Sequence, residues 1–252
     1  MNEWKNKIGE KRLNNFGAKM ELVEYEGKRK YKVLFPEYGL VKENILYRNY
    51  IKGKVSLPKK YIFIGVGGYN SFGSKMIIKE YRKMCDIDVF FPEYDWTFEH
   101  AQFSHFTRGN LKCPYERRYF NVGFMGEGKY NWKDYPKICN KWIHVLERSY
   151  SKSWKKNNPQ YNSTTCGKGF HCLQDFGQWY ENNVYEIKGQ VMDLDKDLLG
   201  KGNKIYSPET CCFLPRCINS SLAHPNKEVL TQLANEYKEE LPKHIYDALI
   251  NY

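Results

Sequence analysis

The amino-acid sequence predicts an α+β chain with two tandem small antiparallel β-barrel repeats of the SH3-like kind, followed by a ββα domain and C-terminal helices. Three observations predict this order. One unit of sequence occurs twice in the N-terminal half, a strand-loop-strand-helix pattern lies near residues 192–219, and apolar residues recur at helical spacing from residue 134 onward. We expect the first repeat at residues 1–58, the second with a connecting strand at 59–130, the ββα domain at 131–224, and a helical pair at 225–252.

The repeat is carried by a tetrapeptide, Phe35-Pro36-Glu37-Tyr38, which returns 56 residues later as Phe91-Pro92-Glu93-Tyr94. The offset holds without a gap for further identical pairs: Gly9 and Gly65, Asn14 and Asn70, Phe16-Gly17 and Phe72-Gly73, Lys19-Met20 and Lys75-Met76, Tyr25 and Tyr81, Val33 and Val89, Gly53 and Gly109, and Pro58 and Pro114. Alternating apolar residues predict strands at 20–25 and 31–35 and at 76–81 and 87–91. Because one unit is too short to bury much surface unless its sheet curls, we expect a small barrel for each copy.

The aromatic residues of the repeats have two interpretations, a barrel core or a platform on which nucleobases stack. Alternating strand positions favour the core for Phe35, Tyr25 and their copies. The loop residues Lys28, Arg29 and Lys30 are candidates for phosphate contact, with solvated surface charge as the alternative.

The composition of the chain favours a polyanionic partner. Forty Lys and Arg residues against 29 Asp and Glu residues give a net charge of +11, which favours nucleic acid or an acidic surface; a merely soluble basic surface is the alternative. We expect no membrane partner, because no apolar run approaches the length of a membrane helix and the polar start does not resemble a signal peptide. We therefore expect a cytoplasmic protein whose eight cysteines are free thiols, and their spacing leads us to expect no zinc.

The C-terminal half is expected to contain several helices. Trp142, Ile143, Leu146 and Tyr150 recur at helical spacing, and a second helix is expected at 173–182. Four basic residues form a candidate phosphate-binding edge or a solvated face: Arg148, Lys152, Lys155 and Lys156. At the end of the chain, apolar residues predict two short helices separated by Pro242, packed on the ββα domain or used for self-association.

The segment from Met192 to Asn219 reads as strand, glycine-bearing loop, strand and helix start, the order of a ββα-metal finger that holds one divalent cation. From about Trp142 to Leu222 the chain resembles phage-encoded HNH endonuclease-like proteins. The resemblance is carried by these stretches: Arg148-Ser149-Tyr150-Ser151-Lys152, residues 176–182, Leu194-Asp195-Lys196-Asp197, Gly202-Asn203-Lys204, and Tyr206-Ser207-Pro208-Glu209-Thr210-Cys211.

The resemblance implies an HNH-like ββα-metal domain with a catalytic pair, Asp195 and Lys196, and two metal ligands, Asp195 and Asn219. Lys196 occupies the position of the general-base histidine of this family. Because an exposed lysine stays protonated near neutral pH, it is a poor base unless buried. Lys196 could instead stabilise negative charge in the transition state, while Asp195, Asp193 or Asp197 activates water or holds the cation.

Further alternatives remain at this site. The aspartate cluster could be a solvated turn, and the finger could be an inactive scaffold that only binds DNA. His144 or His171 could replace the missing base, or could be ordinary surface or core residues.

The functional expectation is a phage or prophage DNA-binding protein of the HNH type that acts in the cytoplasm of a bacterial host cell. The first hypothesis is a DNA endonuclease that depends on a divalent cation, Mg²⁺ or Mn²⁺. The alternative is a non-catalytic protein that binds DNA or another nucleic acid, or that binds a host protein or nucleoprotein complex such as a defence system. Lysine at position 196 favours the alternative.

Overall fold

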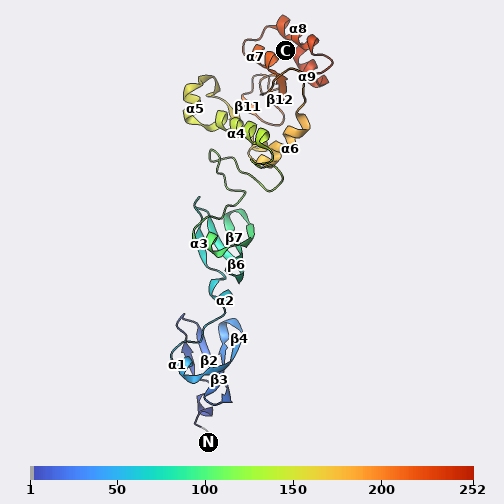
Figure 1. Cartoon of the computed structure of the whole chain (residues 1–252). Helices are drawn as coiled ribbons and strands as arrows, with labels where there is room; N and C mark the ends of the chain where they lie inside the picture. Colours follow the sequence, from blue (N-terminus) through green and yellow to red (C-terminus); the bar gives the residue numbers. More distant parts are fainter. Residues whose placement is uncertain (1–2) are drawn as a thin grey trace. The chain divides into compact units, whose positions relative to one another are not determined.

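The computed structural model describes residues 3–252 of the chain and divides it into two compact units, one ending at Leu111 and one running from Lys112 to Tyr252 (Figure 1). The first unit is built mainly from antiparallel strands, and the second contains most of the helices. The predicted α+β class is therefore confirmed.

The first unit contains two four-stranded antiparallel sheets, each with its strands in sequence order. The first sheet consists of β1 (Lys11–Leu13), β2 (Lys19–Gly27), β3 (Lys30–Phe35) and β4 (Leu40–Leu46), and the second of β5 (Gly67–Tyr69), β6 (Lys75–Lys83), β7 (Asp86–Phe91) and β8 (Trp96–Ala101). The register repeats as well, since Leu22 faces Val33 in the first sheet and Ile78 faces Val89 in the second. The strands predicted within both repeats are confirmed.

The predicted closure of each repeat into an SH3-like barrel is wrong. Within residues 3–252, no strand pairing joins β1 to β4 or β5 to β8, so both sheets stay open. The reason is that each sheet is covered by a short helix, α1 (Tyr47–Ile51) or α3 (Phe103–Thr107), instead of by its own curled edge. Tyr50 of α1 is fully buried and Phe106 of α3 nearly so. These helices cover the apolar faces of the sheets, so burial of those faces does not require a closed barrel.

A buried asparagine fixes the turn between β1 and β2. The Asn14 Oδ1 atom accepts hydrogen bonds from the backbone N–H groups of Phe16 (3.0 Å) and Ala18 (2.9 Å), and its Nδ2 donates to the carbonyl oxygen of Val55 (3.1 Å). One side chain therefore shapes the turn and ties it to the segment that follows α1.

The second repeat reproduces this arrangement 56 residues later. Asn70 Oδ1 accepts from the N–H groups of Phe72 (3.1 Å) and Ser74 (2.9 Å), and Nδ2 donates to the carbonyl oxygen of Leu111 (3.0 Å). The two copies therefore match in the hydrogen bonds of this turn as well as in sequence.

Short helices complete the first unit: η1 (Lys5–Lys7), η2 (Pro36–Tyr38), α2 (Lys59–Phe63) and η3 (Pro92–Tyr94). The PEY part of the repeated tetrapeptide forms a 3-10 turn in both copies, and the preceding Phe35 and Phe91 are completely buried.

The second unit contains the helices α4 (Pro136–Tyr150), α5 (Lys152–Asn157), α6 (Leu173–Asn183), α7 (Arg216–Ser221), α8 (Lys227–Glu236) and α9 (Lys243–Ile250), with 3-10 turns at η4 (Pro159–Tyr161) and η5 (Lys168–Phe170). Strand β10 (Met192–Asp195) pairs antiparallel with β12 (Cys212–Pro215), and β11 (Ile205–Tyr206) pairs parallel with β9 (Thr165–Cys166). Helix α7 packs on both β10 and β12. The predicted order of strand, loop, strand and helix is therefore confirmed.

Side chains of α4, α6 and the strands β9 to β12 form one apolar core. Trp142 lies at its centre, completely buried, and its Nε1 donates a hydrogen bond to the carbonyl oxygen of Phe170 (2.8 Å). A second core joins β12 and α7 to α8 and α9 through Leu214, Ile218 and Leu230. The C-terminal helical pair thus packs on the ββα segment, which is one of the two roles predicted for it.

The eight cysteines, all among the described residues, are free thiols, as expected from the sequence. Within residues 3–252, every helix is too short or too polar to traverse a lipid bilayer.

Replacing either turn asparagine by alanine should destabilise its own repeat. Asn14→Ala removes the acceptor of one buried and one partly buried backbone N–H group and the donor to one carbonyl, at a cost of about 1–3 kcal/mol, and Asn70→Ala should do the same in the second repeat. Hydrogen exchange of the full chain should show lower protection in β2 and β3 for the first variant and in β6 and β7 for the second. The exposed neighbour Asn15→Ala is the control, and protection equal to wild type in all three variants would contradict the role of the turn.

Candidate functional site

A pocket of about 510 Å³ lies in the second unit, between α4, the end of β10 with its following turn, and α7. Its lining is predominantly polar and charged: Lys137, Asn140, Lys141, His144, Val145, Arg148, Tyr161, Asp193, Leu194, Asp195, Lys196, Asp197, Tyr206, Arg216 and Asn219. Four residues selected from the sequence, Arg148, Asp195, Lys196 and Asn219, line this one pocket. We call it the basic pocket, because five of its side chains are Lys or Arg.

Asp195 is the last residue of β10 and is 4% exposed. Its Oδ2 accepts hydrogen bonds from the backbone N–H groups of Asp197 (2.9 Å) and Leu198 (2.8 Å), so the carboxylate shapes the turn after the strand. Burial raises the pKa of Asp195 above its ordinary value, although the two N–H groups favour the charged form. The buried carboxylate therefore has a structural role in the turn.

Lys196 is buried at 6% exposure and held by three neighbours. Its Nζ donates to Asp197 Oδ2 (2.8 Å) and lies 5.6 Å and 5.4 Å from the ring centroids of Tyr161 and Tyr206. Burial tends to raise the pKa of Asp197, but the hydrogen bonds from Lys196 and Lys204 outweigh it and the pKa is lowered. Removing a proton from Lys196 would break this ion pair, so the geometry suits charge stabilisation better than general-base catalysis.

Arg148 reaches the same pair of rings from α4. One guanidinium nitrogen, Nη1, donates to the Tyr206 hydroxyl (3.4 Å), and the guanidinium carbon lies 5.7 Å from the centroid of Tyr161. Burial raises the pKa of Tyr206, which keeps its hydroxyl neutral. Two cationic side chains, Arg148 and Lys196, are thus positioned by the same two tyrosines.

Asp193 contacts two further cationic side chains of the basic pocket. Its carboxylate accepts from Arg216 Nε (3.0 Å) and lies 3.9 Å from Lys141 Nζ. Burial lowers the pKa of Lys141, Asp193 opposes that shift, and the positive charges of Arg148, Arg216 and Lys137 add to it. The lining contains five Lys and Arg side chains against three Asp side chains, and a bound anion would reduce the repulsion among the basic groups.

A second cavity of about 710 Å³ adjoins the basic pocket. Lys137, Lys141, Asp193 and Arg216 line both cavities, and we refer to the two neighbouring cavities together as the groove. The far part is lined by Tyr180, residues 184–192 and Phe213.

The two histidines weighed as substitute bases lie in different surroundings. His144 is exposed on α4 and lines the basic pocket. His171 Nε2 lies 3.0 Å from the Tyr150 hydroxyl and 3.2 Å from the carbonyl oxygen of Cys166, within the packed part of the unit. Only His144 of these two faces the pocket.

The remaining basic candidates do not line the basic pocket. Lys155 donates to the carbonyl oxygens of Thr164 (2.8 Å) and Asn162 (3.3 Å) and so ties α5 to the following loop. Lys152 and Lys156 are exposed on α5.

Lys28, Arg29 and Lys30 lie in the other unit, at the turn from β2 to β3. Lys28 and Arg29 have left-handed backbone conformations, with φ of 48° and 62°. The guanidinium of Arg29 lies 5.0 Å from a Trp4 ring centroid, and Lys30 Nζ donates to Asn44 Oδ1 (3.5 Å).

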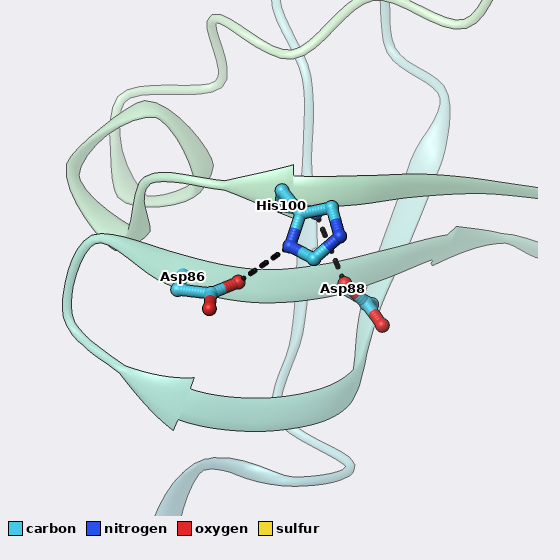
Figure 2. Close-up of side chains that lie close together, drawn as sticks. All are labelled: Asp86, Asp88 and His100. Atoms are coloured by element: carbon cyan, nitrogen blue, oxygen red, sulfur yellow. Dashed lines mark hydrogen bonds and ion pairs between the residues drawn. The ribbon is translucent and has the colours of Figure 1, made fainter.

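Figure 2 shows a cluster that sequence reasoning missed: Asp86 and Asp88 on β7 beside His100 on β8. One ligand atom from each lies within 4.8 Å of the others, and no other such group of three His, Cys, Asp or Glu side chains occurs within residues 3–252. His100 Nδ1 is 2.9 Å from Asp86 Oδ1, and the backbone N–H of His100 donates to Asp88 Oδ1 (3.0 Å). Sequence spacing does not show which residues face each other across paired strands, so this cluster could not be found from local spacing.

Arg82 already neutralises both carboxylates of this cluster. Its Nε donates to Asp86 Oδ1 (2.9 Å), its Nη1 donates to Asp88 Oδ2 (3.1 Å), and its Nη2 contacts both acids. The hydrogen bond from Arg82 lowers the pKa of Asp86 to about 2. A cation would have to displace the guanidinium, so the arrangement reads as a cross-strand ion network with the ligand types of a metal site.

Comparison with known proteins identifies no relative: no family model, no curated protein and no solved structure matches the chain. The HNH resemblance of residues 142–222 therefore stays a prediction from the residues themselves.

Proposed function

We propose that the C-terminal unit binds nucleic acid, with the phosphate backbone of a strand lying in the groove around the basic pocket. The observation that carries the proposal is the convergence of Lys137, Lys141, Arg148, Lys196 and Arg216 on one cavity. Three carboxylates share the cavity, so the basic groups are in excess. Phosphodiester oxygens are the ligands that such arginine and lysine side chains bind in nucleic-acid interfaces.

The shape of the groove supports a polymer rather than a single phosphate. The basic pocket and the cavity next to it share four residues and together offer more space than one phosphate group occupies. The net charge of +11 adds long-range attraction for a polyanion.

The structural role of the acids supports binding as the primary activity. Asp193 and Asp197 hold Arg216 and Lys196 in place, and Asp195 shapes the turn that carries Lys196. The carboxylates thus fix the positions of the cations, which lowers the entropic cost of binding a phosphate.

The variant Lys141→Gln/Arg148→Gln should weaken nucleic-acid binding by about tenfold or more. It should also reduce the slope of log K against log salt concentration by roughly 0.7–0.9 for each phosphate that the protein no longer neutralises. Fluorescence anisotropy of a labelled DNA strand at several salt concentrations measures both quantities. Lys152→Gln/Lys156→Gln removes the same charge from exposed positions on α5 and is the matched control. The proposal is contradicted if the control binds more weakly than the pocket variant, or if wild-type binding does not change with salt. Circular dichroism verifies that both variants are folded.

A second candidate function is hydrolysis of the bound phosphodiester with Mg²⁺ or Mn²⁺. It is favoured by one observation, that His144, Asp195 and Asn219 line the same pocket as the basic groups. In this scheme Asp195 and Asn219 would hold the cation, which would polarise the scissile phosphate. His144 would accept the proton of the attacking water, and Lys196 would stabilise the developing negative charge.

Plasmid cleavage tests this second candidate. Wild type with Mg²⁺ or Mn²⁺ should nick the plasmid, Asp195→Ala and Asn219→Ala should abolish nicking, and His144→Ala should reduce it by about 10²–10⁴-fold, the usual contribution of a general base. Lys152→Gln should cleave as wild type. If no form cleaves while salt-sensitive DNA binding persists, the protein is a binding protein without hydrolytic activity.

A further inference from the structure

The turn between the first two strands of each repeat presents an exposed aromatic ring. We call the segments Phe16-Gly17-Ala18-Lys19 and Phe72-Gly73-Ser74-Lys75 the hairpin tips. Phe16 is 66% exposed and Phe72 is 46% exposed. Single exposed apolar side chains are common on protein surfaces, but here an exposed ring recurs at the same turn of both copies.

The tip phenylalanines differ from the other aromatic residues that the repeats share. Three further identical pairs, Tyr25 and Tyr81, Phe35 and Phe91, and Tyr38 and Tyr94, are buried or half-buried and contribute to the packing of their repeats. The tip pair alone among these identical aromatic pairs is exposed in both copies. Core packing therefore accounts for the other pairs and does not account for this one.

Several surface positions have diverged between the copies, whereas others, such as Glu24 and Glu80, are exposed and identical. Glu26 and Lys30 of the first repeat correspond to Arg82 and Asp86 of the second, so charges at equivalent positions have changed sign. The tips instead keep the phenylalanine, the glycine after it and the lysine three positions on. The ring, the glycine and the lysine are therefore common to both hairpins.

The backbone of each tip is fixed by its asparagine and its glycine. The asparagine two positions before the ring, Asn14 or Asn70, accepts the N–H of the phenylalanine itself. Gly17 and Gly73 take φ values of 82° and 95°, which other residues adopt only with strain. A rigid turn lowers the entropic cost when the ring binds a ligand.

The neighbours of the ring identify the chemistry of that ligand. Lys19 and Lys75 are exposed at the same position of each tip, and the Lys19 ion pair with Glu37 (3.5 Å) is exposed and easily exchanged. A further exposed apolar side chain precedes each ring by three positions, Leu13 at 59% and Tyr69 at 68% exposure. A hairpin that carries an exposed ring and an exposed lysine offers the two groups that bind a nucleotide, a face on which the base stacks and an ammonium that pairs with phosphate.

We propose that each hairpin tip stacks an unpaired nucleobase on Phe16 or Phe72, while Lys19 or Lys75 contacts the adjacent phosphate. The chain then carries two such sites in its first unit, in addition to the groove of the second unit. Both sites are sequence-tolerant, because every base offers a π-face. Two linked sites raise the affinity for one strand through effective concentration.

The test compares two probes on the full chain: a labelled oligothymidylate of about 20 nucleotides, long enough to span more than one site, and an abasic strand with the same number of phosphates. Phe16→Ala and Phe72→Ala should each weaken oligothymidylate binding by about tenfold and the double variant by more, because the stacking of a base is removed. Binding of the abasic strand should stay within about twofold of wild type. Phe16→Tyr and Phe72→Tyr should restore binding, because the ring is retained.

The control is Val41→Ala, which removes an apolar side chain of 46% exposure from β4 of the first repeat and should change neither probe. Removal of basic-pocket charges would weaken both probes together, so failure of the tips and failure of the groove are distinguishable. Three outcomes overturn the proposal: unchanged binding in the double variant, equal weakening with both probes, or reduced self-association in sedimentation with unchanged oligonucleotide binding. The last would show that the tips dock a second copy of the chain.

Discussion

The candidate site depends on the turn that follows β10, where a buried carboxylate and a buried ammonium lie next to each other in sequence. Asp195 closes the turn through two backbone N–H groups, and this directs Lys196 to the ion pair with Asp197. Burial of polar and charged groups is costly unless each has a partner, and here Asp197 pairs with Lys196 while two backbone N–H groups bind Asp195. The rings of Tyr161 and Tyr206 then pack beside Lys196 and reach Arg148. The arrangement of cations in the pocket follows from that constraint.

The two units place their candidate binding residues on different physical supports. In the first unit a single asparagine side chain fixes the turn of each tip, while charges at some equivalent surface positions have changed sign. In the second unit the cations extend from α4, from the turn after β10 and from the first residue of α7, and α4 and β10 contribute Trp142 and Leu194 to one apolar core. Rigid supports of both kinds make exposed rings and basic groups effective, since little conformational freedom remains to be surrendered on binding.

Local patterns predicted much of the fold, and long-range packing decided the rest. The 56-residue repeat, α6 and the order of strand, loop, strand and helix near Asp195 were readable because each depends on periodicity or on near neighbours. Barrel closure was predicted wrongly because nothing local shows that Tyr50 and Phe106, on helices, would cover the sheets. Arg148, Asp195, Lys196 and Asn219 were selected from sequence. Lys141 was missed because only the packing of α4 against β10 brings it to Asp193.

The most direct measurement of the central claim is a titration of the isotope-labelled full chain with a DNA strand, followed residue by residue by nuclear magnetic resonance. If the groove binds the phosphate backbone, shifts in the second unit should cluster at residues 137–148, 193–197 and 216–219, the segments that line the basic pocket. High salt should reverse them, because phosphate contacts are weakened by counterions. Shifts in the second unit confined to α5, around the exposed Lys152 and Lys156, with the pocket residues unchanged, would contradict the account.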